Sequence, residues 1–399
     1  MAVAGYQKMN ALIILFLVSL LLGQLAGISV AQGVTLYLHD FAAVAILVYG
    51  ILTGAIRRSM TGSRLVKSIV AFTIVGVLSL LVNASLVPTT ALWKGSLYLL
   101  RWVVYAGVYF ALAGSLVSSV FLLRGLFLLG TGLAVAGLFQ FVFYPDLRNL
   151  MYLGWDPHYY RVFSTLFDPN FSGILFVLTL IVGVYLFLQK KSIWTIGGIG
   201  ITMTALLLTY SRSSYLGFLA AIGTWIVIRR KWKVGLFGLL LFLVAIVYLP
   251  RPGREALSLD RFDSTVSRLA NWRQSVQRIS QKPMVGYGFN VLPFLREESS
   301  VSSKAGAGID NSFLFVGVTT GLVGLIAYGW LLWSMIGVGN RALIVKKTSI
   351  LGTAYLATLV ALVVDSMFVN SLFYPWVMVW VWILTGVVEV TSDTSRGAR

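Results

Sequence analysis

Cysteine is absent from this chain of 399 residues, and charged residues are scarce. Without cysteine there can be no disulfide, iron–sulfur cluster, thiolate zinc site or cysteine nucleophile. The sequence has only two histidines, His39 and His158, which argues against a histidine-based metal site as well. It also has no Gly-x-x-x-x-Gly-Lys-Ser/Thr loop, so an ATP site of that type is excluded.

Hydrophobic residues make up 58% of the chain and charged residues only 11%, against about 25% charged in an average globular protein. This composition leaves too little polar surface to cover a soluble particle. The sequence therefore predicts an all-α, polytopic membrane protein. The net charge of +18 would suit nucleic acid, but no soluble basic domain is present to bind it, so we expect no such partner.

Membrane-spanning helices need about 20 mostly apolar residues each. Twelve such runs are found, so we expect residues 1–399 to form one transmembrane domain in the lipid bilayer, with both ends on the same side. The fourth run is unusual because it carries Lys94 and Arg101. The runs lie at 11–31, 40–56, 66–84, 93–113, 122–144, 171–189, 192–210, 213–228, 233–249, 311–336, 349–369 and 371–389.

Basic residues gather in alternate short loops, as expected when these loops face the cytoplasm. The short loops assigned to the outer face, at 32–39 and 85–92, contain no lysine or arginine. We therefore place both termini in the cytoplasm. The cytoplasmic set is Lys8, Arg57, Arg58, Arg64, Lys67, Arg124, Lys190, Lys191, Arg229, Arg230, Lys231, Lys233, Arg341, Lys346, Lys347, Arg396 and Arg399.

Residues 250–310 form the one long loop, on the outer face between the ninth and tenth spans. Long loops in compact proteins are usually functional or disordered. Apolar residues recur in this loop at three- and four-residue steps, which predicts an amphipathic helix from about 263 to 281. The apolar positions are Leu269, Trp272, Val276 and Ile279.

Three arginines assigned to the outer face are candidates for binding an anionic substrate. Arg161 and Arg212 lie close to the ends of apolar spans, and Arg268 lies in the long loop. Charges at membrane depth are costly and tend to face a polar cavity. Guanidinium groups suit phosphate oxygens, which they hold in bidentate fashion. The alternative is that these side chains simply extend to the lipid headgroups.

Asp310 directly precedes the apolar run that starts at Phe313. It is a candidate helix N-cap, a candidate general base, or both, because a helix N-terminus also favours the ionised carboxylate. We expect neighbouring arginines to hold it ionised well below neutral pH. Several arginines and one carboxylate suit transfer of a sugar from a polyprenyl diphosphate: the arginines stabilise the leaving diphosphate and the carboxylate deprotonates the attacking hydroxyl.

Four segments resemble, in order, the O-antigen ligase and Wzy-type polymerase superfamily, and we call them the matching segments. The likeness covers about residues 150–390, while the first five spans agree in hydropathy alone. The segments are Arg161 with Phe163–Asn170; Tyr210-Ser211-Arg212; Arg268–Trp272 continuing through Pro283, Gly286 and Gly288; and Asp310–Leu314 with Thr320–Gly324.

The resemblance implies a metal-independent, inverting glycosyltransferase of the GT-C type that needs no cofactor. Its partners would be an undecaprenyl-diphosphate-linked glycan donor and a glycan or glycolipid acceptor, met at the outer, periplasmic face of a bacterial cytoplasmic membrane. By this resemblance Arg212 and Arg268 hold the donor diphosphate, and Arg161 matches an arginine of less certain role. Asn170 and Trp272 lie in the same segments and are further candidates for substrate binding.

One position departs from the family. Many members have a histidine, thought to be the base, where this chain has Asp310. Either the carboxylate replaces the imidazole, or the base lies elsewhere, with His158 as the other candidate, or catalysis has been lost. The change favours a polymerase or an exopolysaccharide transferase over a ligase.

A secondary transporter or a flippase for a lipid-linked oligosaccharide is the main alternative, and a non-catalytic scaffold is a third. Twelve spans suit a transporter, but transporters usually place ionisable groups near the bilayer midplane. Asp365 is the only acid well inside a predicted span. Convergence of Arg161, Arg212, Arg268 and Asp310 in one place would favour the transferase, and dispersal would remove its support.

Overall fold

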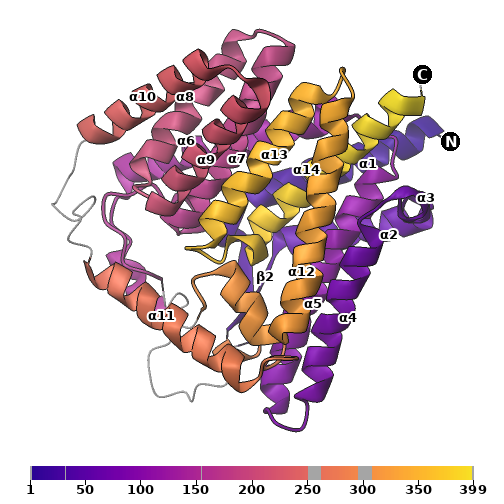
Figure 1. Ribbon diagram of the computed structural model, residues 1–399, viewed down its shortest axis with the longest axis vertical. Helices are drawn as coiled ribbons and strands as arrows, with labels where there is room; N and C mark the ends of the chain where they lie inside the picture. Colours follow the sequence, from indigo (N-terminus) through magenta and orange to yellow (C-terminus); the bar gives the residue numbers. More distant parts are fainter. Residues whose placement is uncertain (1, 32, 154, 250–261, 295–307, 398–399) are drawn as a thin grey trace.

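The computed structural model describes the chain except residues 1, 32, 154, 250–261, 295–307 and 398–399, so parts of the predicted long loop lie outside the described residues. Helices make up most of it (Figure 1). The elements are α1 (Ala2–Leu22), η1 (Gly23–Ala26), β1 (Gly27–Ala31), β2 (Val34–Tyr37), α2 (Leu38–Leu52), α3 (Ala55–Gly62), α4 (Val66–Val82), α5 (Thr89–Ala113), α6 (Ser119–Phe143), η2 (Arg148–Leu153), η3 (Ser164–Leu166), α7 (Pro169–Gln189), α8 (Ile193–Leu208), α9 (Arg212–Arg229), α10 (Trp232–Tyr248), α11 (Phe262–Gln281), η4 (Leu292–Phe294), α12 (Ser312–Ile344), α13 (Ser349–Ser366), η5 (Ser371–Phe373) and α14 (Pro375–Gly397).

Every predicted span overlaps an α-helix, although the number that cross a membrane stays a prediction. Within the described residues, six helices are long and apolar enough to cross, namely α5, α6, α7, α12, α13 and most of α14. The pair α2 and α3, bent by 82°, makes a seventh if it is one broken span. The apolar helices α4 and α8 are shorter, and 17 helical residues reach only about 25 Å. Such helices cross a bilayer only with local thinning or with support from their neighbours.

The first span was predicted to run to residue 31, which is wrong. A short β-hairpin follows the first helix in this otherwise helical fold. The helix α1 ends at Leu22, and residues 27–37 contain the antiparallel hairpin of β1 and β2. Gly23 has φ 60°, a left-handed conformation that commonly follows a helix end. A Cβ atom at Gly23 would lie 2.3 Å from the Thr165 carbonyl oxygen, so only glycine permits this close approach.

Arg101, the unexpected charge in the fourth predicted span, is paired inside α5. Its Nε and Nη2 donate to the two carboxylate oxygens of Asp40 at 2.9 and 2.8 Å, and Nη2 also donates to the Thr35 carbonyl at 2.6 Å. Tyr105 donates its hydroxyl to the same carboxylate. A charge pair of this kind removes most of the cost of placing an arginine in an apolar helix. The pairing therefore makes α5 acceptable as a span.

The helix α12 is broken at Gly321, which has φ 71° and ψ −168°. The segment that follows α11 fills the break. The Pro283 carbonyl accepts the Leu322 N–H at 2.7 Å, while the N–H groups of Tyr287 and Gly288 donate to the carbonyls of residues 318 and 319, both at 3.0 Å. Backbone groups that lose their partners in a helix break need replacements of this kind. The third and fourth matching segments are thus joined through their backbones.

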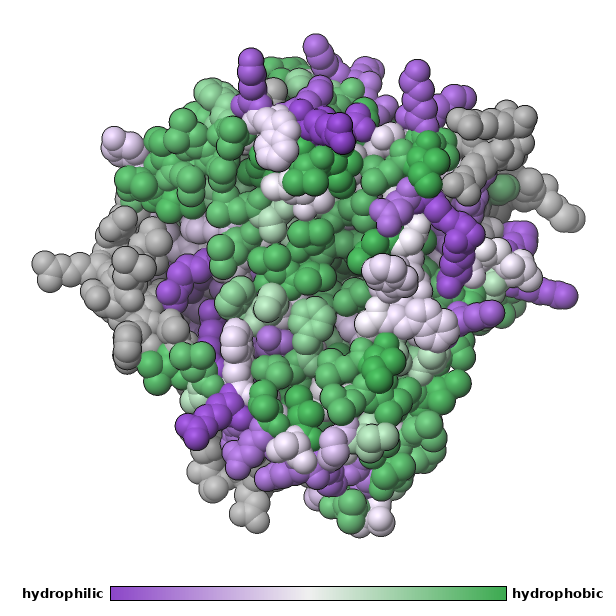
Figure 2. Space-filling view, in the orientation of Figure 1, coloured by the Kyte–Doolittle hydropathy of each residue, from purple (hydrophilic) through white to green (hydrophobic). Residues whose placement is uncertain are grey.

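The surface has the character expected of a membrane protein. In Figure 2, hydrophilic side chains gather toward the upper, right-hand and lower margins, and a broad apolar surface lies between them. Both termini lie toward one end of the molecule in Figure 1, and α11 lies toward the other. This arrangement agrees with two ends on the same side and α11 on the opposite side, while the compartment that each side faces stays a prediction.

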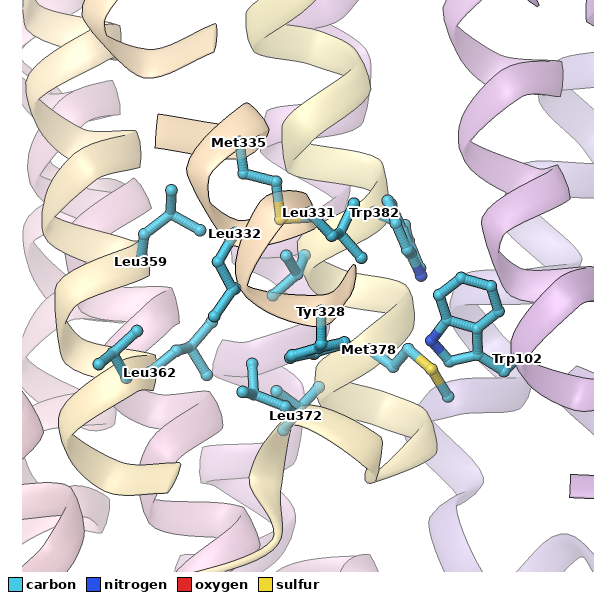
Figure 3. A pocket seen from close by; sticks show the side chains of 13 residues that line it. Trp102, Tyr328, Leu331, Leu332, Met335, Leu359, Leu362, Leu372, Met378 and Trp382 are labelled. Atoms are coloured by element: carbon cyan, nitrogen blue, oxygen red, sulfur yellow. The ribbon is translucent and has the colours of Figure 1, made fainter. Parts of the chain in front are cut away.

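An apolar cavity of about 30 Å³ lies between α5, α12, α13 and α14. In Figure 3, Trp102 faces it from α5, and Leu359 and Leu362 close the opposite side. No charged side chain lines it. The cavity is small, and its apolar walls offer no group for acid–base chemistry. The cavity belongs to the core, and the candidate site lies elsewhere.

Candidate functional site

Arg161 points into the protein, and its side chain ties together the first two matching segments. The residue is only 5% exposed. Its Nε donates to the Thr209 carbonyl at 2.8 Å, and Nη2 donates to the Tyr210 carbonyl at 3.4 Å. The next N–H, of Val162, donates to the Leu208 carbonyl at 2.8 Å. The alternative that Arg161 extends to the lipid headgroups is therefore wrong.

The backbone around Arg161 adopts conformations that side chains disfavour. Tyr160, Ser164, Phe167 and Tyr210 all have φ between 47° and 56°. Each such non-glycine residue costs on the order of 1 kcal/mol or more, and such residues gather at functional sites. The four lie on the two chain segments that Arg161 connects. The fold thus holds a strained loop around a buried guanidinium group.

The start of α7 is fixed by the Asp168-Pro169-Asn170 sequence. Asp168 caps the helix: its Oδ1 accepts the N–H groups of Asn170 at 2.6 Å and Phe171 at 3.2 Å. Pro169 occupies the first helical turn, where its missing N–H costs nothing. Asn170 then presents its side-chain oxygen to the start of α9, where the Ser211 hydroxyl donates to it at 3.0 Å.

Arg212 is the first residue of α9, and its side chain is exposed. Ser211 caps this helix, with its Oγ 3.5 Å from the Ser214 N–H. The hydroxyls of Ser211, Ser213 and Ser214 turn inward and bond to one another or to Asn170. Because the serines hold the inner face of the turn, Arg212 is directed outward from it.

Asn311, and not Asp310, caps α12. The Asn311 Oδ1 accepts the N–H groups of Phe313 at 2.8 Å and Leu314 at 3.0 Å. Its Nδ2 donates to the Met367 carbonyl at 2.8 Å, which fixes the cap to the end of α13. The interpretation of Asp310 as the cap is therefore wrong. Its partly buried carboxylate is left for another role.

Three carboxylates and two arginines form what we call the charged cluster: Asp156, Asp168, Asp310, Arg161 and Arg268. Burial raises the pKa of Asp310, Arg268 opposes this change, and Asp168 adds to it. Burial, then the charges of Asp168 and Asp310, raise the pKa of Asp156 to about 6 against the opposing effect of Arg161. Arg268 thus lowers the pKa of Asp310 as expected, but burial outweighs it and the net change is upward.

The amphipathic helix is confirmed as α11, one residue from its predicted start, but its packed face differs from the expected one. Leu269 and Val276 are 57% and 56% exposed. Ser275 is buried, and Ile279 packs against the core. Trp272 lies beside Phe368, with 6.0 Å between ring centroids. Arg268 is partly buried on this helix, and its charge opposes the rise that burial causes in the pKa values of Asp310 and Asp168.

His158, the second candidate base, lies at the charged cluster too. One ligand atom each from Asp156, His158 and Asp168 lie within 4.8 Å of one another, which is close enough to share a metal ion. Asp168 already commits one oxygen to the α7 cap, and Arg161 acts on both carboxylates. The same grouping also suits an imidazole oriented by a carboxylate. The structure therefore brings both candidate bases, Asp310 and His158, to one place.

Three helix N-termini meet at this cluster. α7 and α9 are joined by the bond from Ser211 to Asn170, and α12 begins next to Asp310. Helix N-termini carry partial positive charge and unpaired N–H groups, so they favour anions. Together with Arg161 and Arg268 they offset the negative charge of the three carboxylates. Arg212, the first residue of α9, is exposed and is not one of the five residues of the charged cluster.

Three acidic residues, Asp156, Asp168 and Asp365, were not among the predicted site residues, although Asp168 lies in the first matching segment. Asp156 lies within residues 145–170, where only His158, Arg161 and Asn170 were selected. Its link to Asp310 depends on a fold that brings together residues more than 150 positions apart. Asp365 was identified as an acid inside a span but was given no role. Its position inside an apolar span was the signal in the sequence. A carboxylate there is costly to bury and therefore requires hydrogen-bond partners.

Three of the four matching segments lie in a part of the sequence that matches a known family. Residues 197–329, about a third of the chain, match the family described as O-antigen ligase (Wzy_C). This match supports the O-antigen ligase and polymerase superfamily. The matched range includes Arg212, α11 with Arg268, and Asp310 with the break at Gly321. A search of curated proteins finds no match. Residues 197–329 are thus similar to an O-antigen ligase domain, and they belong to a chain with several helices long and apolar enough to cross a membrane.

Proposed function

We propose that the protein is a membrane glycosyltransferase that moves a glycan from undecaprenyl diphosphate to an acceptor at the outer face of the cytoplasmic membrane. The acceptor is a growing polysaccharide, lipid A–core or another glycan or glycolipid. The O-antigen ligase domain supports this class of function. The observation that carries the proposal is the convergence of Arg161, Arg268 and Asp310 where three helices begin.

The proposed reaction is a single displacement. The acceptor hydroxyl attacks the anomeric carbon of the donor sugar, the new C–O bond forms as the bond to the diphosphate breaks, and the lipid diphosphate leaves with its electron pair. Asp310 accepts the hydroxyl proton as general base. A carboxylate whose pKa is raised by burial is a stronger base than an exposed one, which suits this task.

The donor diphosphate is proposed to lie between Arg212 and Arg268, near the start of α9. Arg212 is exposed, and Arg268 is only partly buried, so both can reach a ligand. Arg161 is committed to two carbonyls, so its role is to hold the loop and add positive charge. Negative charge builds on the diphosphate as it leaves, and fixed guanidinium groups stabilise that charge most.

Asn170 and Trp272 are proposed to contact the substrate next to these groups. The Asn170 amide has its oxygen held by Ser211, which leaves its NH₂ group to face a ligand. The buried indole N–H of Trp272 has no hydrogen-bond partner among the described residues, so it is available to donate to a sugar hydroxyl. A site that pairs its polar groups with substrate hydroxyls gains specificity.

The test is transfer by the purified protein from an undecaprenyl-diphosphate glycan to candidate acceptors, measured as glycan product and released lipid diphosphate. Arg212→Lys should lose at least about tenfold in rate, because an ammonium group cannot reproduce the planar fork. The control is Arg148→Lys, since Arg148 pairs with Asp146 on the exposed surface and should have no effect on transfer. Wild-type turnover by a folded Arg212→Ala protein would refute the role of Arg212, and no transfer with any acceptor would count against the function.

A further inference from the structure

Asp365, at the end of α13, is a carboxylate with no exposed surface in an apolar helix. A buried charged group destabilises the fold unless several hydrogen-bond partners compensate for the loss of water. Its partners are serine hydroxyls that come from two other parts of the chain. Ser371 donates to Oδ2, Ser214 lies 3.5 Å from Oδ1, and Ser213 donates as well.

On one side, this carboxylate reaches the start of α9 and then that of α7. Ser214, which contacts Asp365, also lies 3.0 Å from the Ser211 hydroxyl and 3.2 Å from the Asn170 carbonyl. Ser211 donates in turn to the Asn170 side chain. A Cβ atom on Gly173 would lie 2.5 Å from the Ser214 hydroxyl, so α7 packs tightly over this network. The direction of Arg212 therefore depends on serines that Asp365 holds.

On the other side, the turn after Asp365 reaches α11 and α12. The Asp365 carbonyl accepts the N–H groups of Phe368 and Val369 at 2.9 and 3.0 Å, which shapes the turn. Within that turn the Met367 carbonyl holds the Asn311 cap, and the Phe368 ring lies beside Trp272. The position of the chain at Asp310 and Trp272 thus depends on the same end of α13.

We infer that Asp365 is a positioning residue that sets the relative placement of Arg212, Asn170 and Asp310 without touching the substrate itself. This inference rests on the proposed function. A carboxylate suits the task because it only accepts hydrogen bonds, so the hydroxyls of Ser213 and Ser371 that bond to it must donate and are held in one orientation. An asparagine at this position would offer N–H donors to hydroxyls that are already oriented as donors, and the serines would have to turn.

The test compares two conservative changes of buried acids. Asp365→Asn alters the network, and Glu389→Gln is the matched control, because Glu389 is also buried and hydrogen-bonded, to Tyr109 and to the Arg64 N–H, but lies in α14 among other partners. Each protein is assayed for thermal midpoint, for kcat and KM of transfer, and for binding of radiolabelled farnesyl diphosphate, a short lipid diphosphate that needs no acceptor.

Asp365→Asn should lower kcat by about 10- to 100-fold and weaken farnesyl diphosphate binding, because small displacements of reacting groups have effects of this size. Glu389→Gln should leave kcat and farnesyl diphosphate binding within about twofold of the wild-type values. This should hold even if its thermal midpoint falls by as much as that of Asp365→Asn. If the wild-type protein transfers and binds, and Asp365→Asn matches it in both assays, the inference is wrong. If the wild-type protein neither transfers nor binds the probe, the proposed function itself fails and this inference with it.

If Asp365→Asn does not fold, Ser213→Ala and Ser371→Ala take its place, because each removes one bond to the carboxylate. Each variant removes one hydrogen bond between a serine hydroxyl and the carboxylate. We therefore expect a smaller loss of kcat, about threefold or more, in each folded protein. Unchanged kcat and binding in both serine variants would overturn the inference.

Discussion

Asp310 and Asn311 are neighbours before α12, and the structure gives them different tasks. Asn311 caps the helix and bonds to Met367, while the carboxylate of Asp310 lies at the charged cluster. Asp and Asn cap helices about equally well, so the sequence alone could not choose between them. The choice is made by the Met367 carbonyl, which comes from another helix and accepts from an amide but not from an ionised carboxylate.

This division of tasks predicts opposite results for two single changes. Asp310→Asn should keep the thermal midpoint and abolish most transfer, because the cap is intact and the base is lost. Asn311→Ala should lower stability by about 1 kcal/mol or more, because both the cap and the bond to Met367 are lost. Thermal unfolding in detergent and the transfer assay measure the two effects. Normal transfer by Asp310→Asn would leave Asp310 without a catalytic role and make His158→Gln the next variant to test.

Asp156 gives a prediction about pH. Its pKa is raised to about 6 in the folded protein, from an ordinary value of 3.8, mainly by burial and next by Asp168 and Asp310. Between these two values the folded state binds more protons than the unfolded state, so stability must fall as pH rises. The penalty is complete above about pH 6 and absent below about pH 4.

Asp156→Asn should therefore raise the thermal midpoint at pH 7.5 and flatten its dependence on pH between about 4 and 6. The measurement is a series of melting curves for both proteins across this range. Asp146→Asn is the control, because Asp146 is exposed and paired with Arg148, which lowers its pKa. Parallel curves for wild type and Asp156→Asn would show that burial does not perturb this carboxyl group.

At the scale of elements, the break in α12 explains why the third and fourth matching segments contain glycine. The sequence analysis noted these segments only for their resemblance to the family. Gly286 and Gly321 both have positive φ, and each lies against the backbone of the other segment. A Cβ atom on Gly321 would lie 2.2 Å from the Met284 carbonyl oxygen, and one on Gly286 would lie 2.5 Å from the Thr319 carbonyl carbon. The two segments therefore require glycine where they meet.

Gly321→Ala should be strongly destabilising, by about 3 kcal/mol or more, since the backbone angle is nearly restricted to glycine and the space is filled. Gly329→Ala, in the same helix, is the control because nothing lies within 4 Å of its added Cβ. That change should be neutral or should stabilise by up to about 1 kcal/mol through helix propensity. Equal melting temperatures for the two variants would mean that the break is not a fixed part of the fold.

At the scale of the whole molecule, the predicted topology can be tested directly because the chain has no cysteine. Single cysteines introduced in 57–67, 190–192, 229–233 and 341–348 should be protected from an impermeant thiol reagent in intact cells. Cysteines placed in 250–308 should react. Labelling after lysis provides the control for each position. A protected long loop would reverse the orientation and move the charged cluster to the cytoplasmic side.

The sequence by itself determined the membrane class, the approximate position of most apolar helices, the amphipathic helix near 263–281 and the candidate residues. These properties follow from the length of the apolar runs and the spacing of apolar residues, which are visible in short stretches of sequence. Only the tertiary structure decided that Arg161 turns inward, that Asn311 caps α12, and that Arg268 is partly buried while Leu269 is exposed. It also decided that Asp156 lies near Asp168 and Asp310, and that Asp365 contacts the start of α9. Each of these depends on a partner distant in the sequence, since the environment of a charge is set by the groups that folding places around it.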